Sequence, residues 1–278
     1  MEPRRRTSVA GTWYPDDPVR LAREVDRYVA QAKIDLPPHP PRALIAPHAG
    51  LMYSGAVAAF AYKAVRDRSY GSAVLVGPSH FVPFHGVALW GEGSWETPYG
   101  PVAVDRALGA AIRKASIEIV DAAAAHGREH SLEMQLPFVA RLLPGVPIVP
   151  LVMGRQTRQT AFALGDAVAE AIGAGGASGE GGVLLVASSD LSHYENASVA
   201  STLDAEMLRH VERIDPEGLM AALEREPRHA CGGGPMVAVL HAARQLGARH
   251  ARVLRYADSG DVSGDKSSVV GYMAAAIW

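Results

Sequence analysis

Residues 43–50, with the sequence ALIAPHAG, decide how this chain is expected to fold. Four small or apolar residues run into Pro47, His48 and Gly50, and an apolar run bounded by proline and glycine predicts a strand buried on both faces. Pro47 lacks the amide hydrogen that a sheet ladder needs, so the strand should end there and leave His48 at the edge of the sheet. In an open parallel sheet, ligands bind at the edge formed by the carboxyl ends of the strands.

Two further segments repeat this arrangement. Residues 73–80 (AVLVGPSH) end in His80, and residues 183–193 (VLLVASSDLSH) end in His193. We therefore expect the three strands to be parallel neighbours in one sheet, or to occupy matching positions in two related halves, with His48 and the other two histidines in one cleft. One such histidine is commonly a structural residue. Three histidines that each follow the end of a core strand predict a metal site or an acid–base site.

Composition limits the kind of protein this is. The chain has 278 residues, 48% of them hydrophobic, and a formal net charge of −2 with 20% charged residues. This is enough for a sizeable core, and because no convincing linker interrupts the chain we expect one domain over residues 1–278. The charge balance gives no reason to expect a nucleic acid or an anionic membrane as partner. The basic cluster at residues 4–6 is interpreted as a solvated N-terminus.

Targeting signals and cysteine usage indicate the compartment. No apolar run approaches the roughly 20 residues that span a bilayer, and residues 1–15 lack the apolar block of a signal peptide. Cys231 is the single cysteine, which excludes an intrachain disulfide and fits a reducing compartment. These features predict a soluble cytoplasmic protein.

Predicted helices and strands alternate along most of the chain. Helices are expected from a start at residues 17–18 and at residues 55–65, 105–115, 131–143, 160–172, 198–211, 216–224 and 235–246. Further strands are expected at residues 147–152, 252–257 and 268–276. Pro137 should kink the helix at 131–143 or delay its start. The alternation predicts an α/β fold with a mostly parallel central sheet and helices on both faces.

Three segments break the alternation. Residues 81–104 hold glycines and prolines between short β-prone pieces and predict an antiparallel excursion or a loop beside the site. Residues 173–182 contain six glycines and predict a flexible surface loop. Residues 258–266 (DSGDVSGDK) predict a turn-rich loop near the site, without the full ligand pattern of a calcium loop.

Cys231 opens the sequence CGGGP directly before a predicted helix. Glycines let the backbone approach a bound group closely, and a helix N-terminus lowers the pKa of a thiol. The alternative is a small buried residue at a tight turn. With His48 and His80, Cys231 completes a set of two imidazoles and one thiolate. Such a set suits Fe(II), Zn or Cu, and three protein ligands leave room for water or substrate.

Asp190 and His193 stand three residues apart in SSDLSH, a spacing that places both on one face of a first helical turn. Asp190 would then fix the tautomer of His193, whose other nitrogen would accept a proton. Alternatively, Ser188 and Ser189 cap a helix in which Asp190 is a first-turn charge.

The polar sequence EHSLE at residues 129–133 is open to two interpretations. Glu129, His130 and Glu133 either support the site or contact substrate, or they form a solvated helix start. The sequence does not favour one interpretation over the other.

Seven motifs in this order resemble the Memo family, labelled AmmeMemoRadiSam system protein B in bacteria and archaea. They are AGTWYP, APHAGLMYSG, GPSH, EHSLEMQLPF, SSDLSH, CGGGP and SGDVSGDKSSVVGY, and the resemblance runs from about Ser8 to the C-terminus. It implies a fold similar to that of class III extradiol ring-cleavage dioxygenases, non-haem iron as metal, and a radical-SAM protein as partner.

The resemblance also assigns roles to individual residues. It maps the metal ligands of the family onto His48, His80 and Cys231, and further pocket residues onto Asp190 and His193. The ring-cleavage enzymes carry a carboxylate where this chain has Cys231, and a thiolate is a softer and oxidisable ligand.

Three functional hypotheses follow from these residues. The first is a cytoplasmic metal-dependent redox protein, dioxygenase-like, with Fe(II) held by the three ligands and His193 as general base oriented by Asp190. The second is a non-enzymatic module that binds a peptide or protein in the same pocket. The third is a thiol hydrolase with a Cys231–His193 pair, which leaves two further histidines without a role.

Overall fold

The computed structural model describes residues 2–174 and 181–278 and places the doubly buried segment of the sequence in the middle of a nine-stranded sheet. Its strand order is β10-β12-β2-β9-β3-β8-β4-β7, with β11 also paired to β12. The strands are β2 (Ala43–Ala46), β3 (Tyr70–Pro78), β4 (Val87–Leu89), β7 (Ile119–Asp121), β8 (Ile148–Met153), β9 (Gly182–Ser188), β10 (His193–Glu195), β11 (Ala251–Asp258) and β12 (Val269–Ile277).

The centre of the sheet is parallel, but the whole sheet is mixed. Strand β2 runs parallel to β9, β9 to β3, and β3 to β8. Strand β12 is antiparallel to β2, β10 and β11, and β4 is antiparallel to β8. The α/β class is confirmed, while the expectation of a mostly parallel sheet holds only for the centre. The short connection between β11 and β12 explains part of the difference, because a parallel pair needs a crossover of a dozen or more residues.

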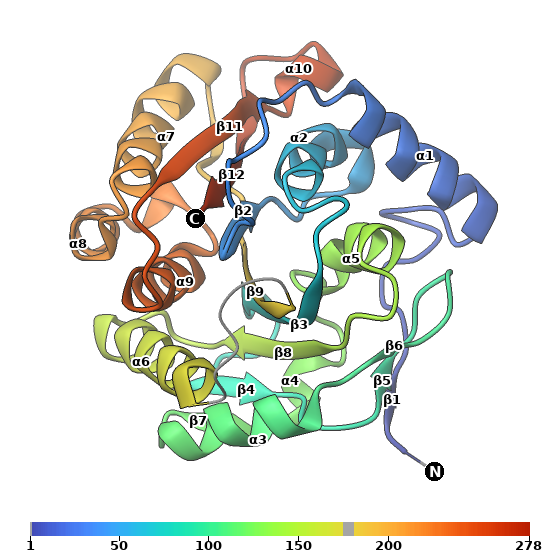
Figure 1. Cartoon of the computed structure of the whole chain (residues 1–278). Helices are drawn as coiled ribbons and strands as arrows, with labels where there is room; N and C mark the ends of the chain where they lie inside the picture. Colours follow the sequence, from blue (N-terminus) through green and yellow to red (C-terminus); the bar gives the residue numbers. More distant parts are fainter. Residues whose placement is uncertain (1, 175–180) are drawn as a thin grey trace.

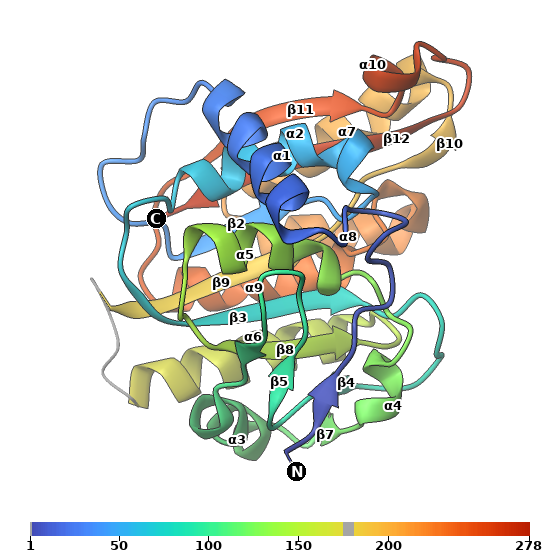
Figure 2. The same cartoon turned by 90° about the vertical axis from the view of Figure 1, so that its right-hand side faces the viewer.

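Helices cover both faces of the sheet (Figures 1 and 2). Leu44 of β2 packs into the core under α1 (Pro18–Gln31), α2 (Leu51–Lys63) and α5 (Leu136–Leu142). The next residue, Ile45, points to the other core. That core is covered by α3 (Arg106–Ala115), α6 (Arg158–Ala174), α7 (Ala197–Glu212), α8 (Pro216–Arg225) and α9 (Gly233–Gln245). This alternation is the burial on both faces that the sequence predicts.

Helix starts follow the predicted capping signals. The Asp17 side chain accepts a hydrogen bond from the amide of Arg20 at the start of α1, and Asp215 does the same for Gly218 at the start of α8. Pro137 lies in the first turn of α5, after the short helix η1 (Glu133–Gln135), so the late start is confirmed. None of the described helices is long and apolar enough to cross a membrane.

The segments that break the alternation have partly regular structure. Residues 81–104 contain β4 and the antiparallel pair β5 (Ser94–Trp95) and β6 (Val102–Ala103), which confirms the antiparallel excursion. The segment 258–266 includes a short helix, α10 (Gly260–Ser263). Of the predicted glycine loop, residues 175–180 lie outside the described residues.

The N-terminal basic cluster is not simply solvated, which corrects the prediction. Strand β1 (Arg4–Arg5) pairs in parallel with β5, and the Arg5 side chain is only 2% exposed. Its guanidinium forms an ion pair with Glu133, which is fully buried. A buried cation is stable only with such a partner, and the partner lies 128 residues away in the chain.

Candidate metal centre

The strands that precede the three histidines are parallel neighbours, in the order β2-β9-β3. His48, His80 and His193 all line one cleft of about 450 Å³ at the carboxyl ends of these strands. The prediction of a shared cleft is confirmed. The full lining is Trp13, His48, Ala49, His80, His130, Asp190, His193, Tyr194, Cys231 and Val270.

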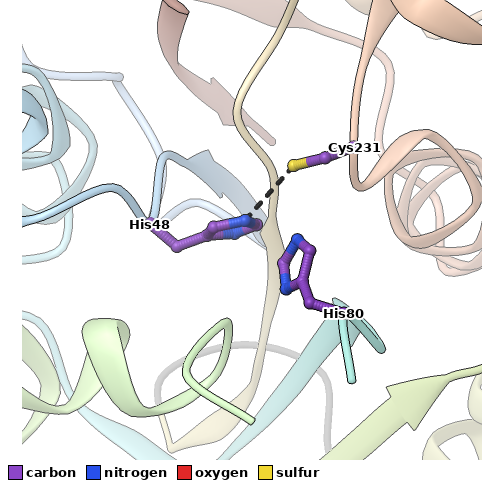
Figure 3. A group of neighbouring side chains, drawn as sticks. All are labelled: His48, His80 and Cys231. Atoms are coloured by element: carbon purple, nitrogen blue, oxygen red, sulfur yellow. Dashed lines mark hydrogen bonds between the residues drawn. The ribbon is translucent and has the colours of Figure 1, made fainter. Parts of the chain in front are cut away.

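The side chains of His48, His80 and Cys231 converge within this cleft (Figure 3). One ligand atom from each lies within 4.8 Å of the others. The Cys231 Sγ atom is 3.2 Å from His48 Nε2. This convergence brings together three residues from widely separated parts of the chain, as a metal site with three protein ligands requires.

Hydrogen bonding at Nδ1 directs the other ring nitrogen of His48, Nε2, toward the Cys231 thiol. Ser188 Oγ donates its one hydrogen to the Ser131 carbonyl (2.6 Å) and accepts a hydrogen bond from Gln135 Nε2 (2.7 Å). Because its hydrogen is already used, Ser188 Oγ accepts at 3.0 Å from Nδ1–H of His48. Gln135 is fixed in turn by the Tyr62 hydroxyl, 2.9 Å from its Oε1. Burial, followed by the nearby His80 and His130, holds the pKa of His48 well below its usual range.

His80 is oriented in the same way by a carboxylate. Its Nδ1 is 2.9 Å from Glu129 Oε1, which also accepts from the amides of His130 (2.9 Å) and Ser131 (2.8 Å). Burial alone would raise the pKa of Glu129, but the hydrogen bonds from His80 and the backbone outweigh it and lower that pKa to about 2. A carboxylate on one nitrogen of a histidine directs the other nitrogen toward a metal.

The glycines after Cys231 allow close packing against the end of β9. A Cβ atom at Gly232 would lie 2.4 Å from the Ser188 carbonyl oxygen, so a larger residue would push the two backbones apart. The Gly232 amide donates to Ser189 Oγ at 3.0 Å. Burial, then the Asp190 carboxylate, raises the pKa of the Cys231 thiol. The charge of a bound divalent cation would lower it again.

The helical turn expected at residues 188–193 is absent, and this changes the role of Asp190. Its Oδ1 accepts from the amides of His48 (2.7 Å) and Ala49 (3.3 Å), so it positions the backbone at His48. Burial raises the pKa of Asp190 to about 6. His193 begins β10, and its Nδ1 lies 2.7 Å from the Leu191 carbonyl, which fixes its tautomer instead.

The two serines of SSDLSH do not cap a helix. Ser188 belongs to the network around His48, and Ser189 Oγ donates to the Asp190 carbonyl at 2.8 Å. The thiol-hydrolase pair of the third hypothesis is not formed either, because the imidazole nitrogen beside the Cys231 thiol belongs to His48.

The EHSLE segment is buried at the site, so its interpretation as a solvated helix start is wrong. Glu129 is 1% exposed and Glu133 is fully buried. The His130 ring stacks on His80 with centroids 4.6 Å apart and lies 4.4 Å from the Trp13 ring. Burial, then His80, lowers the pKa of His130 to about 4.

His80, Glu129 and His130 form a second group with closely spaced ligand atoms. Both Glu129 oxygens already accept hydrogen bonds, so we assign this carboxylate to support of His80 rather than to a second metal.

The sequence analysis left the role of His130 open and did not assign Trp13, Gln135 and Ser131 to the site. Three of them lie within the EHSLEMQLPF motif and Trp13 within AGTWYP, so the motifs themselves were the available signal. Glu133 connects the two motifs in space. Its Oε1 accepts from the Val9 amide at 3.0 Å and from the Tyr14 hydroxyl at 2.8 Å. This carboxylate therefore holds the segment that brings Trp13 to the cleft.

Comparison with known proteins agrees with the motifs. Residues 5–276 match the family described as Memo-like protein. A MEMO1 family protein of Methanothermobacter thermautotrophicus is 38% identical over 276 residues, covering 96% of this chain and 98% of the relative. MEMO1 family proteins of Sulfolobus acidocaldarius and Methanosarcina mazei are each 37% identical over 97% of this chain, covering 98% and 97% of their own lengths. This chain belongs to the Memo family.

Proposed function

We propose that this protein binds a metal ion in the cytoplasm, with Fe(II) as the expected metal and Zn or Cu as alternatives for the site. With a redox-active ion such as Fe(II), we infer that it carries out dioxygenase-like redox chemistry, which Zn could not support. One observation carries the proposal: a ring nitrogen of His48, a ring nitrogen of His80 and the Cys231 thiol converge, while the Nδ1 atom of each histidine is already hydrogen-bonded. Two imidazoles and a thiolate are a donor set that these metals accept.

The chain's own residues would divide the remaining work. A bound metal would supply the one-electron chemistry that the side chains of the cleft lack. Three protein ligands leave room for a small-molecule or peptide ligand. His193 would accept a proton at Nε2, because its Nδ1 is engaged by the Leu191 carbonyl. Asp190 would act by holding the backbone of His48 in place.

Metal analysis of protein purified without oxygen tests the ligand set. Alanine at His48, His80 or Cys231 should each abolish stoichiometric metal while circular dichroism shows an intact fold. Affinity should also fall with pH as protons compete for the ligands. Full metal content in Cys231→Ala protein would remove the thiolate from the site.

His193→Ala protein provides the matched comparison, because His193 lines the same cleft outside the ligand set. It should keep near-normal metal content and lose on the order of 10²- to 10⁴-fold in oxygen-consuming turnover with a substrate. Loss of the metal would make His193 a ligand, and unchanged turnover would remove it from the mechanism.

Exposed aromatic side chains that line the cleft or contact its lining favour a second candidate function, a peptide- or protein-binding module. Trp13 is 38% exposed, Phe81 49% and Tyr194 77%. Tyr194 also has a φ of 63°, a conformation that costs free energy for a non-glycine residue and is common at ligand sites. Under this candidate, metal-bound protein would consume no oxygen, and Tyr194→Ser would weaken peptide binding without loss of metal.

A further inference from the structure

A second cavity lies at the opposite edge of the sheet from the metal centre. It has a volume of about 600 Å³ and is formed where the parallel strands begin. Arg42 directly precedes β2, Arg68 lies before β3, and Gly182 opens β9. Figure 2 shows the chain terminus after β12 on this side and β10 on the other. The cavity is therefore separate from the cleft that holds His48.

Three arginines and two histidines line this cavity, and no aspartate or glutamate is among its described lining residues. The lining is His39, Pro40, Pro41, Arg42, Arg68, Tyr70, Ile172, Gly182, Val183, Leu246, Gly247, Arg249, His250 and Trp278. The chain as a whole carries a net charge of −2, so the positive charge is concentrated at this place. Like charges around one cavity repel each other and weaken the fold unless an anion offsets them.

Two of the arginine side chains, Arg68 and Arg249, donate to carbonyl oxygens rather than to carboxylates. Arg68 Nη2 donates to the Pro37 carbonyl at 3.4 Å. Arg249 Nη1 donates to the carbonyls of Ala248 (2.8 Å) and Arg244 (3.1 Å). Arg42 and Arg68 are half-buried and Arg249 is exposed, and in residues 2–174 and 181–278 none of the three lining arginines forms an ion pair with a carboxylate. Each guanidinium has five N–H donors, so donors remain for a ligand.

Hydrogen bonds fix the backbone around the cavity, so the cavity is preformed. The Arg42 amide donates to the Ile277 carbonyl at 2.7 Å, and its carbonyl accepts from the Leu185 amide at 2.9 Å. The Tyr70 hydroxyl donates to the Pro41 carbonyl at 2.8 Å, which fixes the proline-rich segment over the cavity. A preformed site loses less conformational entropy on binding than a flexible one.

We propose that this cavity binds a small phosphorylated molecule through Arg42, Arg68 and Arg249. Arginine forks match the geometry of phosphate oxygens and can bind them in pairs of hydrogen bonds. The volume falls within the range of small-molecule sites and exceeds what an isolated phosphate ion fills. Leu246, Tyr70 and Trp278 supply apolar surface for the organic part of such a ligand. The site is independent of the metal centre and of its proposed chemistry.

Isothermal titration calorimetry with inorganic pyrophosphate and with phenyl phosphate tests the proposal on the full chain. Wild-type protein should bind at least one probe saturably at a single site. Tighter binding of phenyl phosphate indicates a phosphate ester whose ring packs on the apolar lining, and tighter binding of pyrophosphate indicates a diphosphate. Arg42→Gln, Arg68→Gln and Arg249→Gln should each weaken binding about tenfold or more, because each removes a charge-assisted hydrogen-bonding partner.

Two controls distinguish binding in this cavity from binding elsewhere on the protein. Arg23→Gln removes the same charge from an exposed position on α1 and should leave binding unchanged. Cys231→Ala should also bind the probes normally, which excludes phosphate binding to a metal in the other cleft. Thermal unfolding of the arginine variants without probe should show a melting temperature at or above that of wild type. Failure of both probes to saturate, or equal affinity in the cavity variants and Arg23→Gln, would overturn the proposal.

Discussion

The buried ion pair between Arg5 and Glu133 gives the sharpest prediction about stability. The Arg5 side chain is 2% exposed and Glu133 is fully buried. In a Glu133→Gln protein the amide keeps the shape of the side chain but leaves the positive charge of the Arg5 guanidinium without its negative partner. Breaking a buried pair by removing one charge costs about 3–5 kcal/mol. A typical domain has only about 5–15 kcal/mol of stability, so this is a large fraction of it.

Urea unfolding followed by circular dichroism measures this cost, and the chain offers a matched control. Asp26 forms an ion pair of 2.7 Å with Arg141, but these side chains are 49% and 43% exposed. Asp26→Asn should therefore cost only about 0–1 kcal/mol. Glu133→Gln should also speed hydrogen exchange at the amides of Ser8 and Val9, which now donate to the carboxylate. Equal costs for the two variants would refute the reasoning that burial decides the value of the pair.

Two further outcomes are expected. Ser188→Ala removes the acceptor of His48 Nδ1–H, so metal affinity measured by chelator competition should fall about 10–100-fold; an unchanged affinity would exclude this role. Burial lowers the pKa of His126 to about 4 from its usual 6.5. As the pH falls, the unfolded chain binds a proton at His126 before the folded chain does. The contribution of His126 to the free energy of unfolding is therefore complete above about pH 6.5, and about 3 kcal/mol of it is lost as the pH falls to about 4. In urea unfolding between pH 7.5 and 4, His126→Gln should show a shallower loss of stability than wild type, and an identical slope would contradict the assignment.

The sequence was informative where the signal is local. The doubly buried strand at 43–46 could be predicted because apolar runs and the proline after them act on neighbouring residues. The caps of α1 and α8 could be predicted for the same reason. The meeting of His48 with His80 followed from one general rule, that the carboxyl ends of parallel strands share an edge.

The features that sequence reasoning missed depend on partners far apart in the chain. Arg5 appeared to be a solvated terminal residue because its partner lies 128 residues away. The orientation of β12, which makes the sheet mixed, depends on pairing with β2, more than two hundred positions earlier. The spacing alone predicted that Asp190 would fix the tautomer of His193. The loop before β10 is not helical, however, and His193 is hydrogen-bonded to the Leu191 carbonyl instead.

One short segment, residues 129–135, connects the separate parts of the candidate metal centre. Glu129 holds His80, the Ser131 carbonyl and Gln135 hold Ser188 against His48, and Glu133 holds the N-terminal segment that carries Trp13.

A shift of this segment would therefore disturb both proposed imidazole ligands and one wall of the cleft together. For that reason we expect Glu133→Gln, although Glu133 contacts none of the proposed ligands, to weaken metal binding as well as the fold. The control Asp26→Asn should leave metal affinity unchanged. If Glu133→Gln loses stability but keeps full metal affinity, the two histidines are held independently of the N-terminal segment, and the coupling through residues 129–135 is wrong.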